Sequence, residues 1–142
     1  MDFWTAVTST IRHIHPLITD FPAAFLPLSV VLNLLSRKWP NLRQSAWITM
    51  LIGTGGAILA FITGDATAEN LPSTYRQLVP PHQLMAIVTT LIFTGLSIWK
   101  WRSQRKKIEI MNKPLFIILS IVGMICLIIT GMFGGSMVFD HG

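Results

Sequence analysis

The stretch His13-Ile14-His15-Pro16-Leu17-Ile18-Thr19-Asp20-Phe21-Pro22 leads histidines and a carboxylate directly into an apolar segment. Ionisable side chains in hydrocarbon are expensive, so their presence where a membrane-length segment opens indicates a function. Much later in the chain, Pro80-Pro81-His82-Gln83-Leu84 again sets a histidine at the start of an apolar segment. The sequence therefore predicts a protein organised around two histidine-bearing helix openings.

The composition places the chain in a membrane. Apolar residues make up 51% of the chain, charged residues only 12%, and the mean hydropathy is +0.58. Four segments approach the roughly 20 residues that a helix needs to cross a bilayer, namely 17–35, 46–63, 82–101 and 114–133. At 142 residues the chain suits one domain. We predict an all-α, integral membrane four-helix bundle in which residues 1–142 form a single four-span domain.

Most of the positive charge lies in two segments that join these spans. Nine of the eleven Lys and Arg residues are Arg37, Lys38, Arg43, Lys100, Arg102, Arg105, Lys106, Lys107 and Lys113. Such loops stay in the cytoplasm, which predicts a multi-pass cell-membrane protein with both termini outside, periplasmic or extracellular. The net charge of +5 is thus a topology signal and not a sign of nucleic-acid binding. Arg105-Lys106-Lys107 is either a solvated flank, which we favour, or a contact for anionic headgroups.

The N-terminal residues predict a separate element before the first span. Residues 2–12 place apolar side chains at helical spacing, namely Phe3, Trp4, Val7 and Ile11. We expect a short interfacial helix lying on the outer surface. The first span then opens with Pro16 in its first turn, while Pro22 and Pro27 kink it. The last span is expected to end in the glycine-rich segment 131–135.

The two halves of the chain match at an offset of 67 residues. The matched pairs are His15/His82, Leu17/Leu84, Gly56/Gly123, Ile58/Ile125, Ile62/Ile129, Thr63/Thr130 and Gly64/Gly131. Two helical hairpins in the same orientation form a parallel internal repeat about an axis along the membrane normal. We therefore expect His15 and His82 to lie at equal depth and to face one another. Gly56 and Gly123 are expected at helix–helix contacts.

The predicted topology gathers the unusual polar residues on the outer side. They are His13, His15, His82 and His141, with Asp20, Asp65, Glu69 and Asp140. Helix bundles build cofactor and metal sites from residues on facing helices. His15 and His82 could therefore be axial ligands of haem b, with His141 in reserve and His13 less important. His15, His82, His141 and Asp20 could instead hold a transition metal ion.

Other roles for these residues stay open. Asp20 with His15 could relay protons, or Asp20 could cap the kinked backbone near Pro22. Each histidine could simply be an interfacial residue bonded to water or to a carbonyl group, in which case no cofactor is bound.

A set of short motifs runs through all four spans. They are His15-Pro16-Leu17, Phe21-Pro22, Thr63-Gly64-Asp65-Ala66 with Glu69, His82, Thr130-Gly131, Gly134-Gly135 and His141-Gly142. With them the whole chain resembles a bacterial family of small four-helix predicted membrane proteins, domain of unknown function 2231. Members of that family carry further histidines at the positions of Asp20 and Met132. If the family binds haem or metal, this implies an altered site here, with Met132 either a soft ligand or a packing residue.

The leading functional prediction is a membrane-embedded, histidine-lined protein that binds haem b and transfers electrons. The alternatives are a structural or accessory subunit of a membrane complex and a metal-binding membrane protein. The expected partners are the lipid bilayer, a redox protein on the outer side and further copies of the chain. No nucleic acid is expected, and the resemblance implies no settled enzymatic activity.

Overall fold

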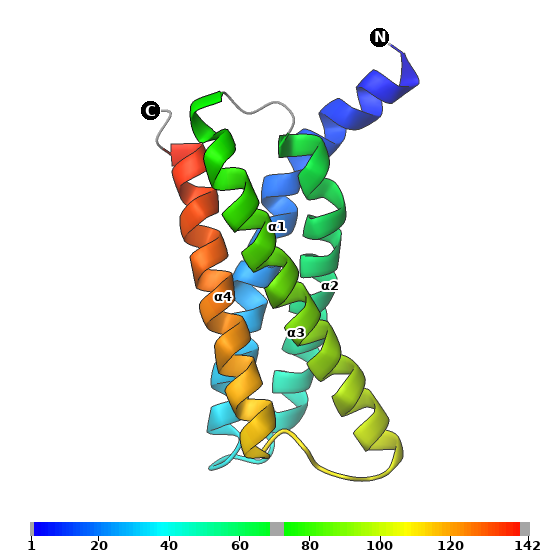
Figure 1. Ribbon diagram of the computed structural model, residues 1–142. Helices are drawn as coiled ribbons and strands as arrows, with labels where there is room; N and C mark the ends of the chain where they lie inside the picture. Colours follow the sequence, from blue (N-terminus) through cyan, green and yellow to red (C-terminus); the bar gives the residue numbers. More distant parts are fainter. Residues whose placement is uncertain (1, 69–72, 140–142) are drawn as a thin grey trace.

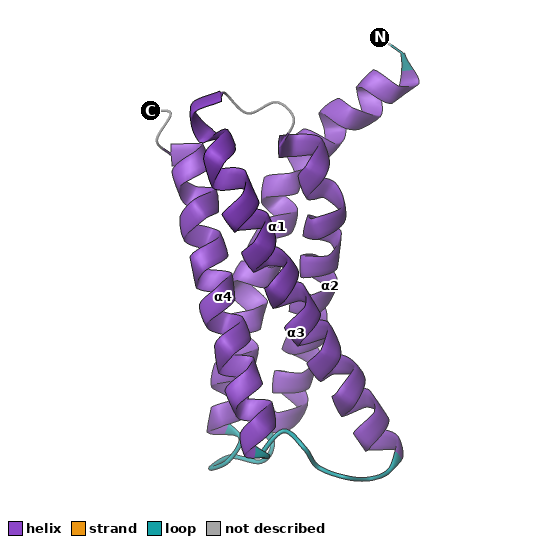
Figure 2. Cartoon of the chain, viewed as in Figure 1, coloured by secondary structure: helices purple, strands orange, loops and turns teal. Residues whose placement is uncertain are grey.

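The structure is a computed structural model that describes residues 2–68 and 73–139. Its elements are α1 (Phe3–Leu35), α2 (Leu42–Ala68), the 3₁₀ helix η1 (Ser73–Leu78), α3 (Val79–Arg105) and α4 (Pro114–Phe139). The described residues contain helices and loops but no strand (Figure 2). Four of the helices are long and apolar enough to cross a membrane. The prediction of an all-α membrane four-helix bundle is confirmed.

The four long helices form a ring. The most extensive contacts join α1 to α2 and α3 to α4, and smaller contacts join α2 to α3 and α1 to α4. Helices α1 and α3 therefore lie on one diagonal of the ring, with α3 in front and α1 behind it in Figure 1. The first hairpin is closed by residues 36–41 and the second by residues 106–113. These two loops, with the helix turns next to them, are called the basic end below.

The buried core lies between the middle of the bundle and the basic end. Large, fully buried apolar side chains come from all four long helices and from the second loop, namely Leu26, Met50, Phe93, Phe116, Ile110 and Met111. Several buried hydroxyls bond within their own helices, as where Ser29 donates to the Leu26 carbonyl oxygen at 2.7 Å, whereas the buried Thr89 hydroxyl has no hydrogen-bond partner among the described residues. Large apolar side chains such as Leu59, Leu91 and Ile118 remain exposed on the outside. An apolar exterior is what lipid contact requires.

Close helix contacts occur at the two matched glycines, as the sequence predicted. A Cβ atom on Gly56 would lie 2.7 Å from Phe21 Cβ and 2.9 Å from Pro22 Cδ. A Cβ atom on Gly123 would lie 2.8 Å from Phe93 Cε2. Both glycines are buried, and each lets a neighbouring helix approach more closely than any side chain would allow.

The N-terminal residues do not form a separate helix, so that prediction was wrong. Helix α1 is continuous from Phe3 and contains Pro16, Pro22 and Pro27, so Pro16 does not open a span. The polar residues before Pro16 do not interrupt the helix because their hydroxyls bond its own carbonyl oxygens; Thr10 Oγ1 donates to Ala6 at 2.9 Å. The first turns of α1 nevertheless leave the bundle at an angle (Figure 1).

Helix α4 is also longer than predicted, because it continues through Gly134 and Gly135 to Phe139. No glycine in the described residues has a positive φ, so these two glycines do not end the helix. Helix α2 passes Gly64 as expected and ends at Ala68. The predicted break at Pro72 lies outside the described residues.

Candidate functional site

His15 lies on α1 at the end of the bundle opposite the basic end, where it contacts α2. Its Nδ1 atom is 2.8 Å from Thr63 Oγ1. The Thr63 hydroxyl also reaches the Leu59 carbonyl oxygen at 3.0 Å, and when it donates there it accepts from the His15 Nδ1–H. In that arrangement His15 carries its proton on Nδ1. Its ring also lies beside Gly64, where a Cβ atom would be 3.6 Å from His15 Cε1.

His82 occupies the corresponding place in the second hairpin. It lies in the first turn of α3, and its Nδ1 atom is 3.0 Å from the Thr130 carbonyl oxygen on α4. A carbonyl oxygen can only accept, so His82 also carries its proton on Nδ1. Its ring packs on Gly134, where a Cβ atom would lie 3.2 Å from His82 Cε1.

The two histidines are related as the repeat predicts. Each bonds a residue 48 positions later in its own hairpin, and both partners belong to the matched pair Thr63/Thr130. They lie on the diagonal helices α1 and α3. Both rings are partly buried, and among the described residues both make their hydrogen bonds through Nδ1. A neutral imidazole protonated on Nδ1 has its lone pair on Nε2, the atom through which it can bind a metal centre.

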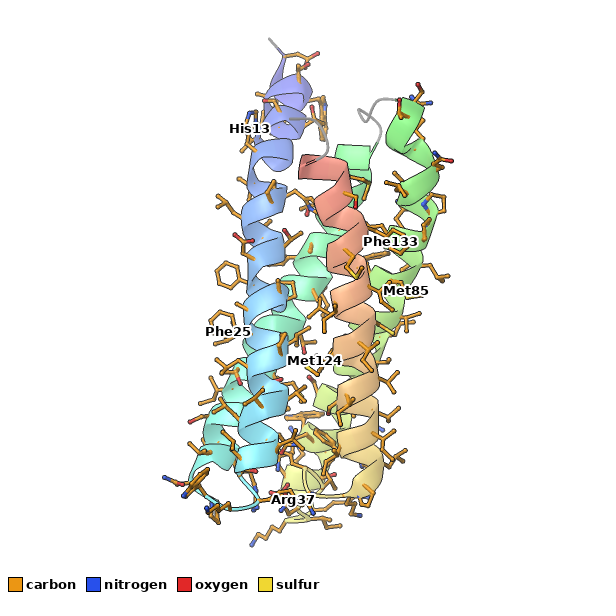
Figure 3. The ribbon with its side chains drawn as sticks, turned by 90° about the vertical axis from the view of Figure 1, so that its left-hand side faces the viewer. His13, Phe25, Arg37, Met85, Met124 and Phe133 are labelled. Carbon is orange, nitrogen blue, oxygen red and sulfur yellow. The ribbon has the colours of Figure 1, made fainter. Side chains whose placement is uncertain are left out.

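The other predicted ligands do not join this pair. His13 is exposed, its Nδ1 atom lies 2.7 Å from the Ser9 carbonyl oxygen, and its ring points away from the bundle (Figure 3). Asp20 is exposed on α1, and Met132 is 68% exposed on α4. His141, Glu69 and Asp140 lie outside the described residues, as does the side chain of Asp65. Within the described residues, no group of three or more His, Cys, Asp or Glu side chains could hold a metal ion.

A second polar cluster, at the basic end, was not predicted from the sequence. Lys100 on α3 is only 5% exposed, and its Nζ atom lies 3.1 Å from both carboxylate oxygens of Glu109. The backbone N–H of Met111 donates to Glu109 at 2.8 Å, and Arg43 on α2 lies 3.7 Å from the same carboxylate. One signal was available: Glu109 is the only acidic residue in the basic segment between the third and fourth spans.

This environment changes the acidity of Glu109. Burial raises the pKa of the Glu109 carboxyl group, but the Met111 N–H and the Lys100 and Arg43 cations lower it by more. The pKa therefore lies below its ordinary value of 4.5, and Glu109 is ionised at neutral pH. It neutralises the buried Lys100 and fastens the loop 106–113 to α3.

Four membrane-length helices in a ring, with a histidine at the same point of each hairpin, define a small multi-span membrane protein. The chain belongs to the family described as "Predicted membrane protein (DUF2231)", which it matches over residues 12–142. This confirms the resemblance found in the sequence motifs. Neither the curated proteins nor the solved structures gave a match to the chain.

Proposed function

We propose that His15 and His82 are the axial ligands of a haem b iron and that the protein transfers electrons within a membrane. The observation that carries this proposal is the matched pair of Nδ1 hydrogen bonds, to Thr63 and to Thr130. Histidine ligands characteristically donate their second ring N–H to an oxygen acceptor, which fixes the ring and raises its basicity. Two imidazoles on opposing helices suit a low-spin haem.

The number of ligands favours haem over a bare metal ion. A porphyrin supplies four nitrogen donors, so the protein needs to add only two imidazoles. A zinc or copper ion would need three or four protein donors, and the described residues supply no such group. A metal-ion site would therefore have to include His141, which lies outside those residues.

The proposal includes an orientation in the cell membrane. The basic loops would remain in the cytoplasm, and both termini with the histidine end would lie outside. The length of α2 supports this arrangement: Thr63 follows Leu42 by 21 residues, or about 32 Å of helix. That distance is close to the hydrocarbon thickness of about 30 Å, so the imidazoles would lie near the outer interface. A redox partner would then approach from the outer side, whether the protein acts alone or as a homo-oligomer.

A structural role is the second candidate, and the same hydrogen bonds favour it. His15 links α1 to α2, and His82 links α3 to α4. These links would stabilise each hairpin in an accessory subunit of a membrane complex even if no cofactor were bound.

An absorption spectrum separates these candidates. The protein is purified from haem-replete cells, and its spectrum is recorded oxidised and after dithionite reduction. We expect low-spin haem bands in the wild type, which His15→Ala and His82→Ala lose. His13→Ala is the matched control, because His13 is exposed and bonds only its own helix, and it should keep the spectrum.

A folded but colourless wild type would contradict haem binding. Metal analysis of the same sample would then distinguish a metal-ion site from a structural role. In the structural case both histidine variants would lower the thermal stability, and neither metal nor haem would be found.

A further inference from the structure

A pocket of about 450 Å³ with charged and apolar walls opens at the basic end. It lies where the C-terminal part of α3 leans away from the other helices (Figure 1). Its polar lining comes from the first loop, α2, α3 and the second loop: Asn41, Arg43, Gln44, Lys100, Gln104 and Lys107. Glu109 is the single acidic side chain among these groups. Three cations facing one carboxylate leave the pocket with an excess of two positive charges.

This positive charge is incompletely paired. Glu109 accepts from Lys100 at 3.1 Å, whereas Arg43 is only within 3.7 Å of the same carboxylate. The Nε atom of Arg43 is buried and has no hydrogen-bond partner among the described residues. A buried donor without an acceptor is costly, so the site favours an additional anion.

Lys107 lines the pocket in a backbone conformation that is unfavourable for a lysine. It follows the end of α3 with φ = 56°, the left-handed conformation that glycine usually provides at this position. Lys107 N–H donates to Gln104 at 3.0 Å and Ile108 N–H to Ser103 at 2.9 Å, which closes the helix end. A lysine in place of glycine costs stability there, and Lys107 is one of the residues that line the pocket.

An apolar groove continues from the pocket along the membrane-facing side of α2 and α3. It has a volume of about 320 Å³ and shares Trp47 and Gln104 with the pocket. Its other walls are Leu51, Ser97, Ile98 and Trp101. Leu51, Ile98 and Trp101 are 45%, 47% and 49% exposed, so the groove is open to the surrounding bilayer.

We propose that the pocket and groove together bind one anionic phospholipid, with its phosphate at Arg43 and Lys107 beside the Lys100–Glu109 pair, and with one acyl chain along α2 and α3. A basic pocket between helices at a membrane interface suits an anionic headgroup. The adjoining apolar groove selects a lipid over a free phosphate ion. Arg105 lines neither the pocket nor the groove, and its guanidinium group packs over the Trp101 ring, 4.2 Å from the ring centre. The site is at the opposite end from the histidines, so its test is independent of haem.

Native mass spectrometry of the full chain in detergent tests this assignment. The protein is incubated with phosphatidylglycerol or with phosphatidylcholine of the same acyl chains. We expect one phosphatidylglycerol to stay bound. Arg43→Gln should weaken its retention about tenfold or more, through loss of a charge-assisted hydrogen bond. Lys107→Gly removes a second cation and relieves the backbone, so it should weaken retention without lowering the unfolding temperature.

Two further arms complete the experiment. Lys38→Gln is the matched control, since Lys38 carries the same charge at the same end but packs over the Trp39 ring, and it should retain the lipid. Glycerol phosphate and inorganic phosphate lack acyl chains and should therefore compete poorly with the lipid. Their affinity should be lower than that of the lipid by about tenfold for every two methylene groups that the groove buries. Equal retention of phosphatidylcholine, displacement by millimolar phosphate, or full retention in Arg43→Gln and Lys107→Gly would each overturn the proposal.

Discussion

At the scale of single residues, the two histidines differ in the kind of acceptor that orients them. His15 donates to a side-chain hydroxyl, whereas His82 donates to a backbone carbonyl oxygen. The Thr130 hydroxyl plays no part in the second bond, because it donates to the Cys126 carbonyl oxygen at 2.8 Å. The acceptor of His15 can therefore be removed by mutation, and the acceptor of His82 cannot.

This difference predicts unequal effects of two identical substitutions. Thr63→Val should weaken haem binding about 10- to 100-fold, the usual cost of losing a partner of a ligand. Thr130→Val should leave the affinity nearly unchanged, because the carbonyl oxygen remains. Haem titration of the apo-protein, followed by absorption, measures both affinities. Equal losses in the two variants would contradict the inferred hydrogen-bond roles, and Thr63→Ser should restore binding.

Glu109 carries a second residue-scale prediction. Glu109→Gln would leave the buried Lys100 without a counter-charge. Because the carboxylate is partly exposed, we expect a loss of about 1–3 kcal/mol in the free energy of unfolding. Thermal unfolding in detergent at pH 7 measures it, with Glu109→Asp as a charge-preserving control. An unchanged unfolding temperature in Glu109→Gln would show that Lys100 does not depend on this partner.

The pH dependence of that loss follows from the lowered pKa of Glu109. A carboxyl group with a lowered folded-state pKa contributes stability above its unfolded-state pKa, here the ordinary value of 4.5. The contribution disappears as the pH falls from 4.5 through the folded-state pKa. The stability difference between wild type and Glu109→Gln should thus be constant from pH 6 to 8 and shrink below pH 4.5. A difference that grows on acidification would contradict the lowered pKa.

The pairing of candidate site residues could be predicted from the sequence where a scarce residue type recurs at a fixed offset. His15 and His82 could be paired because histidine is rare in this chain. The exposure of Asp20 and the pairing of Glu109 could not be predicted, since they depend on which helix face turns inward. That face is set by packing between helices, which apolar sequences leave open because both lipid and core accept the same side chains.

At the scale of elements, the full length of α1 was not predicted from the sequence. Its 33 residues correspond to about 50 Å, well beyond the hydrocarbon thickness of about 30 Å. Asp2 caps it, with its carboxylate accepting from Thr5 N–H at 2.8 Å. Proline suggested helix boundaries because it removes a hydrogen bond. In a membrane bundle, neighbouring groups satisfy the freed carbonyls, so the helix continues through three prolines.

The packing of α1 on α2 predicts the effect of replacing Gly56. Gly56→Leu would drive a side chain into Phe21 and Pro22, and Gly123→Leu into Phe93. Each should destabilise the bundle by about 1–3 kcal/mol through overpacking. Gly55→Leu is the matched control, because a Cβ atom there meets nothing within 4 Å. Thermal unfolding in detergent compares the three variants, and equal stability in all of them would show that the close contacts are not maintained in solution.

At the scale of the whole molecule, the bundle has two chemically different ends. The histidine end carries two imidazoles held by Nδ1 hydrogen bonds, and the basic end gathers cations around a pocket. The ring order places α1 and α3 on a diagonal, and each of these helices carries a histidine that bonds the neighbouring helix of its own hairpin. The sequence predicted this correspondence between the two hairpins through its 67-residue offset. It did not reveal the pocket, whose residues come from four separate segments brought together only by folding.

The orientation of these ends is tested by reporter fusions. Fusions at residues 40 and 108 should report the cytoplasm, and fusions at residue 72 and after residue 142 the outside, because basic loops resist translocation. Two double variants strengthen the test. Replacing Lys106 and Lys113 with Gln should weaken the preference for basic loops in the cytoplasm, whereas replacing Arg12 and Arg76 with Gln should strengthen that preference. If a fusion at residue 105 reported the outside, the histidine end would face the cytoplasm, and the proposed redox partner on the outer side would be wrong. The lipid proposal would survive that result, because it refers to the basic end itself and not to the side of the membrane on which that end lies.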